Sequence, residues 1–224
     1  MRTRFIKLPV VMLFVAGILA LADRDASALG IGAYGQIKNT WATVTADYID
    51  PVPPLNDFIE SSDATRIMYS FGFVLDTNVS IDSIFNYRLQ LGIGFGTLSI
   101  DGRNYNDDID LIEYSMYHSF GFGIIRSEKV RVWLGPQVGF GYASGKYSYA
   151  YESNKEYREV FVSLGAILGF NIHITNGISL GIAGGIRETI LFAIGSASND
   201  LFLDYTDPYA FEAFGDVSIL FRFE

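Results

Sequence analysis

The feature that most restricts the fold of this chain is the alternation of apolar residues with small or polar ones. Between residues 85 and 96, every odd position is apolar and every even position is Asn, Arg, Gln or Gly. A period of two is that of a β-strand, because successive side chains point to opposite faces of a sheet. Residues 67–75 and 160–173 show a similar pattern, and no stretch after residue 28 has sustained helical spacing. The chain is therefore predicted to be all-β.

Further alternating segments bring the predicted number of strands to eight. They are residues 30–46, 111–125, 130–143, 178–192 and 209–223. An even number of strands suits an eight-stranded antiparallel up-and-down transmembrane β-barrel, with both termini at one end. Most segments exceed the roughly 9 to 11 residues that cross a bilayer, so strands are expected to project beyond it. We expect a bulge or distortion at Gly135-Pro136, because proline donates no ladder hydrogen bond.

Glycine and charge indicate that the apolar face points outward, into lipid. The opposite face repeatedly carries Gly, which suits the crowded inside of a narrow barrel better than a solvated surface. A polar interior with an apolar exterior is the membrane arrangement. The strand parity predicts a side-chain-filled lumen with a charged network of Asp76, Arg88, Arg131, Arg187, Glu212, Asp216 and Arg222, and it puts His173 on the same face.

Residues 1–28 have the features of a secretory signal peptide. Basic residues precede an apolar core from Val10 to Leu21, and Ala26-Ser27-Ala28 offers small residues for cleavage. We predict cleavage between Ala28 and Leu29, which leaves residues 29–224 as one barrel domain. The alternative is a short membrane anchor, although the apolar run is short for a span.

Composition excludes several other classes of site. The chain has no cysteine and two histidines, so thiol chemistry is excluded and the composition does not favour a structural zinc site. Residues 29–224 carry 12 basic and 23 acidic side chains, which makes nucleic acid a poor partner. No cofactor and no metal site are predicted.

The predicted connections alternate between short and long. Short turns fall at residues 76–83, 126–129 and 175–177, and long polar segments at 47–66, 101–110, 144–159 and 196–208. Outer-membrane barrels have short periplasmic turns and long external loops. The long segments hold 15 acidic and 5 basic residues, a charge that could attract cations or basic proteins, bridge to lipopolysaccharide through divalent ions, or serve only solubility.

Three tyrosines alternate in the third long segment, at Tyr147, Tyr149 and Tyr151. They predict an aromatic face on a hairpin that continues above the membrane, where it could contact sugars or a protein partner. Packing against neighbouring loops or lipid headgroups, where tyrosine is favoured, is the alternative.

Two short motifs resemble catalytic or nucleotide-binding signatures. Residues 30–35 satisfy G-x-G-x-x-G, but no strand precedes them in the mature chain and no helical pattern follows. His118 and Ser119 are a base and a nucleophile, but adjacent strand residues point to opposite faces. We assign no catalytic residues and expect His118 to be a tolerated histidine facing lipid near a membrane boundary.

Three segments resemble the small outer-membrane barrels of the OmpA, OmpX and OmpW type. They are Phe85-Asn86-Tyr87-Arg88-Leu89, the run from Val130 to Pro136, and the closing alternation Ile219, Phe221, Phe223. The resemblance covers residues 29–224. It implies an integral protein of a Gram-negative outer membrane, in contact with outer-membrane lipid and inserted by the barrel-assembly machinery, and the signal peptide implies export through the periplasm. Members typically end on an aromatic residue, whereas this chain ends Phe223-Glu224.

The expected function is a structural or surface-interaction role rather than enzymatic activity. One alternative is a narrow OmpW-like transporter of small or hydrophobic molecules. The other is a lipid-A-modifying barrel enzyme, for which the pair at residues 118–119 lacks the geometry.

Overall fold

The computed structural model describes residues 29–48, 58–77, 84–101, 106–149, 152–193, 201–204 and 209–223. The cleavage site at Ala28 lies outside this part of the chain. No helix in the described part is long and apolar enough to cross a membrane. The strands are β1 (Leu29–Tyr48), β2 (Phe58–Asp76), β3 (Phe85–Asp101), β4 (Asn106–Arg126), β5 (Val130–Tyr149), β6 (Glu152–Thr175), β7 (Ile178–Ala193), β8 (Leu201–Asp204) and β9 (Tyr209–Phe223).

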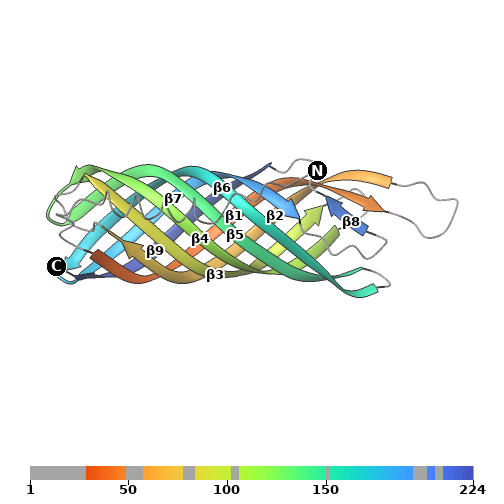
Figure 1. Ribbon diagram of the computed structural model, residues 1–224, viewed down its shortest axis with the longest axis horizontal. Coiled ribbons are helices and arrows are strands. Elements are labelled where there is room, and N and C mark those ends of the chain that lie inside the picture. Colours follow the sequence, from red (N-terminus) through yellow and green to blue (C-terminus); the bar gives the residue numbers. More distant parts are fainter. Residues whose placement is uncertain are drawn as a thin grey trace, which may run out of the picture.

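Eight of these strands form a closed antiparallel barrel, as the alternation predicts (Figure 1). Each of β1 to β7 pairs with its neighbours in sequence order, β7 pairs with β9, and β9 returns to β1. Ile31 of β1 pairs with Leu75 of β2 on one side and with Phe221 of β9 on the other, which closes the wall. Leu29 pairs with Phe223, so the described chain begins and ends at the same end of the barrel.

The ninth strand, β8, is an addition that the sequence pattern does not predict. It lies in the long segment 196–208 and pairs with Thr45 to Tyr48 of β1. These residues lie at the end of the barrel away from Leu29 and Phe223, which is called the outer end; the opposite end is called the turn end. Strand β9 pairs with β1 only as far as Trp41. Both run antiparallel to β1 on the same side of it. Strand β8 therefore continues, nearer the outer end, the pairing that β9 makes with the rest of β1. Pro208, which has no amide hydrogen to donate, stands between them in the sequence.

Every barrel strand except β9 is longer than predicted, and the predicted long loops are correspondingly shorter. Strand β2 begins at Phe58, β4 begins at Asn106, and β5 and β6 continue pairing up to Tyr149 and Glu152. Much of segments 47–66, 101–110 and 144–159 is therefore hairpin. Antiparallel pairing satisfies backbone hydrogen bonds whatever the polarity of the side chains, so the ladder continues where the apolar alternation stops.

Alternate side chains face outward and inward as the sequence predicts. On β2 the outward residues Tyr69 and Phe71 are 61% and 59% exposed, whereas the inward Met68 and Ser70 are buried. On β9 the outward Ile219, Phe221 and Phe223 are more than half exposed. An apolar surface of this extent around a closed barrel suits contact with lipid rather than water.

Glycines on the inner face make room for large side chains. The Trp133 ring is fully buried inside the barrel, flanked by Gly121 on β4 and Gly169 on β6. A Cβ atom at Gly169 would lie 2.2 Å from the indole, and one at Gly121 would lie 2.6 Å from it. These two glycines are therefore steric requirements of the tryptophan between them.

The bulge or distortion expected at Gly135-Pro136 is present as a distortion without a bulge. Gly135 and Pro136 stay in register with Ile167 and Ala166 of β6, and the β4–β5 register is the same before and after them. The bridges opposite Phe120 and Gly121 of β4 are missing from the ladder, so the proline interrupts pairing on that side without inserting a residue. The register shift between β4 and β5 falls at Gly123–Ile125, beside the turn.

Candidate functional site

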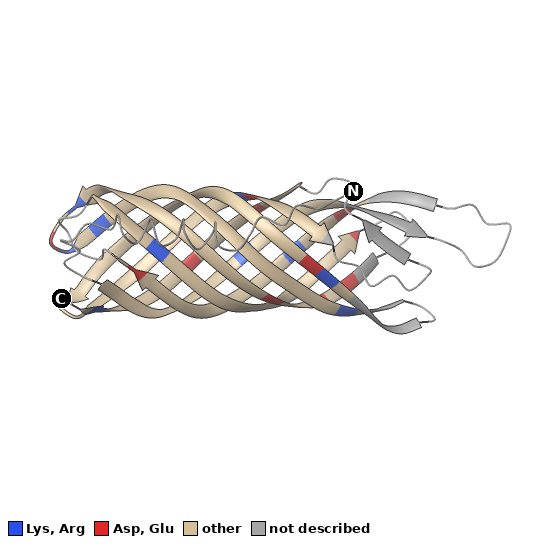
Figure 2. Cartoon of the chain, in the orientation of Figure 1, with Lys and Arg blue, Asp and Glu red and all other residues tan. Residues whose placement is uncertain are grey.

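The candidate functional site is the interior of the barrel, where ten ionisable side chains are almost completely buried. Five are basic and five are acidic: Lys38, Arg66, Arg88, Arg131, Arg187, Asp76, Glu113, Glu159, Glu212 and Asp216. Figure 2 shows that charged positions occur along the strands and not only at the barrel ends. A buried charge is costly unless an opposite charge compensates it, and this set sums to zero when all ten groups are ionised.

A central cluster joins Lys38, Glu113, Tyr117, Arg187 and Glu212. The Lys38 ammonium lies 2.6 Å from Glu113 Oε2 and 3.5 Å from Glu212 Oε2, and it donates to the Tyr117 hydroxyl at 3.1 Å. Glu212 also pairs with the Arg187 guanidinium. Each carboxylate of the cluster therefore has a cation, and Lys38 links both carboxylates.

Aromatic rings and one amide complete the surroundings of Arg187. Its guanidinium carbon is 4.0 Å from the centre of the Tyr117 ring and 3.9 Å from that of Phe214. Its Nη1 donates to Gln137 Oε1 at 3.0 Å, and the Gln137 amide donates to Ser119 Oγ at 2.8 Å. Stacking and hydrogen bonds in a fixed fork hold a guanidinium in one orientation.

Toward the outer end, Arg66 pairs with Glu159 across the lumen. The Tyr157 hydroxyl donates to the same carboxylate at 2.5 Å. Phe161 separates this pair from the central cluster, with the Lys38 nitrogen 4.9 Å and the Arg66 guanidinium carbon 5.9 Å from its ring centre. Beside the Arg66 pair, inward apolar residues pack together, namely Ala64, Met68, Leu98, Ile100, Ile109, Leu111 and Tyr157.

Toward the turns, a second charged group fills the barrel. Arg88 Nη2 is 2.9 Å from Asp216 Oδ1 and donates to Ser218 Oγ at 3.0 Å. Asn86 connects two further charges, because its amide nitrogen is 3.4 Å from Asp76 Oδ1 and its oxygen is 3.4 Å from Arg131 Nη2. From the turns to the outer end, side chains therefore cross the lumen at three levels.

The structure places six of the seven residues proposed for the lumen network among these buried groups. Arg222 differs, since it is half-buried at the turn end and its guanidinium donates to the Thr175 carbonyl oxygen. His173 also lies at this end, with Nδ1 2.8 Å from Ser179 Oγ.

Four lumen charges were missed by the sequence reasoning. Lys38 and Glu113 share the parity of inward Gln36 and Ser115, so strand parity alone could have identified them. Arg66 and Glu159 were assigned to loops, and only the true lengths of β2 and β6 bring them into the lumen.

The motif residues lie in separate environments. His118 faces outward and shares a 2.6 Å hydrogen bond with the Tyr87 hydroxyl, whereas Ser119 faces inward. The G-x-G-x-x-G segment is part of β1 and is not followed by a helix. Tyr147 and Tyr149 are residues of strand β5, of which the structure describes only the backbone at these positions, and Tyr151 lies outside the described residues. The aromatic face expected there stays a prediction. Among the described residues, no group of three or more His, Asp or Glu side chains could hold a metal ion.

Comparisons with known proteins relate the chain to outer-membrane barrels by fold. No protein-family model and no curated protein matches it. The solved structure of OprG from Pseudomonas aeruginosa matches with a TM-score of 0.51 at 8% identity, over 88% of this chain and 96% of that one. Weaker matches are Neisserial surface protein A (TM-score 0.36, 14% identity, 85% and 97% covered) and Ail of Yersinia pestis (0.37, 11%, 85% and 99%). The chain thus has the fold of the small eight-stranded outer-membrane β-barrels.

Proposed function

We propose that this chain is an integral protein of the bacterial outer membrane that acts through its outer surface and does not conduct solutes through its lumen. The observation that carries the proposal is the set of ten compensated charges that crosses the interior. An eight-stranded barrel leaves a space that side chains can just fill. The apolar residues beside Arg66 and Glu159 add a second obstacle toward the outer end.

The proposed role is structural or surface-interacting, and non-enzymatic. The motif most suggestive of catalysis, His118-Ser119, is divided between the two faces of the wall. The acidic outer segments suit a cationic or basic protein partner. The barrel-assembly machinery is the proposed partner during insertion, supported by the outward aromatic residues at the end of β9.

Electrical recording from the purified protein in planar bilayers tests the closed lumen. We expect no stable conductance from the wild type. The double variant Lys38→Ala/Glu113→Ala removes the ion pair that crosses the lumen in the central cluster. We expect channel openings to be recorded from this variant. The control is Leu134→Ala, on the outward face, which should behave as the wild type. Stable wild-type conductance would instead favour the narrow transporter.

A further inference from the structure

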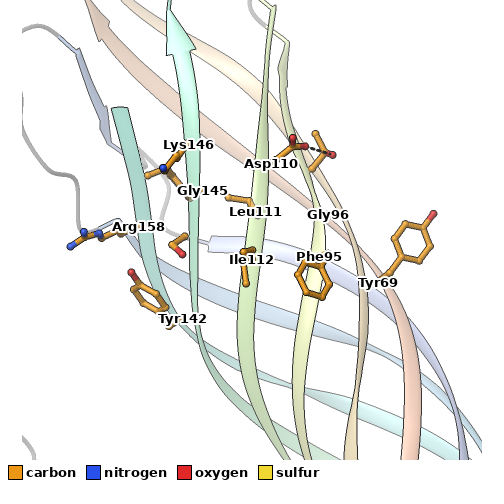
Figure 3. Close-up of a pocket in the computed structure, with 13 residues that line it drawn as sticks. Tyr69, Phe95, Gly96, Asp110, Leu111, Ile112, Tyr142, Gly145, Lys146 and Arg158 are labelled. Atoms are coloured by element: carbon orange, nitrogen blue, oxygen red, sulfur yellow. Dashed lines mark hydrogen bonds between the residues drawn. The ribbon is translucent and has the colours of Figure 1, made fainter. Parts of the chain in front are cut away.

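Two grooves follow one another along the outside of the wall, over strands β2 to β6. The upper groove has a volume of about 820 Å³ and is lined by outward residues that include Tyr69, Phe95, Ile112, Lys146 and Arg158 (Figure 3). The lower groove, of about 690 Å³, has an almost wholly apolar lining that includes Phe71, Ile93, Met116 and Phe140. Tyr142 lines both grooves, so they adjoin at this residue, and the charged residues belong to the upper one.

The upper groove holds two cations whose placement is unusual in this protein. Of the other basic residues whose side chains are described, Arg126, Lys129 and Arg222 lie at the turn end, and the rest lie inside the barrel. Lys146 and Arg158 are exposed on the outward face, near the outer ends of β5 and β6. Ser144, two residues before Lys146, pairs directly with Arg158, so the two cations lie on adjoining strands at the head of the groove.

We propose that these two adjoining grooves are a binding site for a phosphate-bearing glycolipid of the outer leaflet. Lys146 and Arg158 would bind its phosphate, and the lower groove would hold its acyl chains. An ammonium and a guanidinium are suited to phosphate, the guanidinium through a fork of parallel donors. Tyr142 lies at the boundary, where an aromatic ring with a polar tip is favoured. This inference rests on the proposed outer-membrane location.

Asp110 makes the proposal more specific. Its carboxylate accepts a hydrogen bond from the Thr97 hydroxyl at 3.4 Å, and its backbone pairs directly with that of Lys146. A carboxylate beside a phosphate site repels the ligand. Asp110→Asn should therefore strengthen lipid binding, an effect that a purely structural role of this residue would not produce.

The test is a titration of the purified full barrel in nonionic detergent with diphosphoryl lipid A, with bound lipid counted by native mass spectrometry. We expect the double variant Lys146→Gln/Arg158→Gln to weaken binding at least tenfold and Asp110→Asn to strengthen it severalfold. The matched control is Arg126→Gln/Lys129→Gln, which removes two exposed cations from the turn end and should bind as the wild type does. Heat-modifiable gel mobility checks that each variant is folded.

A second arm uses the same lipid without its phosphates. Weaker binding of this lipid to the wild type, with little further loss in the Lys146/Arg158 variant, is the expected result. Equal binding of both lipids, or equal loss in the control variant, would overturn the phosphate site. Cell fractionation tests the proposed location separately. A barrel found outside the outer membrane would refute the proposed function, whereas the titration in detergent would still show whether the grooves bind the lipid.

Discussion

Lys38 and Glu113 form an ion pair of 2.6 Å across the lumen, between strands β1 and β4, which are not neighbours in the wall. Both side chains are completely buried. The pair therefore ties opposite parts of the barrel together, and Glu113 depends on Lys38 for compensation, whereas Lys38 also has Glu212 at 3.5 Å.

Removal of one member of this pair should destabilise the barrel strongly. We expect Lys38→Met to lower the free energy of unfolding by about 3 to 5 kcal/mol, the usual cost of leaving a buried charge, here Glu113, without its partner. The double variant Lys38→Met/Glu113→Leu should recover much of that loss. Urea unfolding in lipid vesicles, followed by tryptophan fluorescence, measures both. Additive losses in the double variant would show that the two residues are not coupled.

A second prediction concerns Arg88, which pairs with Asp216 at 2.9 Å. Arg88→Leu should lower the urea midpoint markedly, because Asp216 would remain buried without its cation. The adjacent Leu89→Ile, which conserves volume on the outward half-buried side, should cost less than about 1.5 kcal/mol. If Arg88→Leu were as stable as the wild type, the charged interior would not be a stabilising network.

The third prediction concerns the space around Trp133. Gly169→Ala would place a methyl group 2.2 Å from the indole, so we expect a loss of about 1 to 3 kcal/mol through overpacking, together with a shifted tryptophan emission. Gly35→Ala is the matched control, because nothing lies within 4 Å of the added atom. An unchanged emission in Gly169→Ala would mean that the ring is not held between these glycines.

The fourth prediction concerns orientation in the membrane. The chain has no cysteine, so single-cysteine variants can be labelled cleanly. On intact cells, a bulky maleimide too large for porins should modify Asp101→Cys at the outer end of β3 and leave Ser127→Cys in the β4–β5 turn unmodified. Permeabilising the outer membrane should expose Ser127→Cys. Labelling in the reverse order would invert the topology.

The sequence predicts the barrel well because its main determinant is local. Alternation in residues 85–96 fixes which side chains of β3 face inward, and the same parity brings Arg88 and Asp216 to one face of the wall. It cannot pair them, since 128 residues separate them and their approach depends on the stagger of a closed barrel. The strand ends around Arg66 and Glu159 were mistaken for loops. Their strand structure depends on backbone hydrogen bonds, which do not require the apolar alternation by which strands are recognised in the sequence.

The ion pairs also bear on the order of assembly. Lys38–Glu113, Arg66–Glu159 and Arg88–Asp216 each join strands that are not neighbours, whereas Arg187 and Glu212 lie on adjoining strands. In an open or half-curled sheet the six charged groups of the three cross-lumen pairs would lack their partners. Their transfer into the hydrocarbon core would then cost free energy. The Arg88–Asp216 pair needs the last strand, β9, and the other two pairs need the sheet to curl until opposite strands face each other. We therefore expect the interior to favour insertion of the closed barrel over insertion of an incomplete sheet.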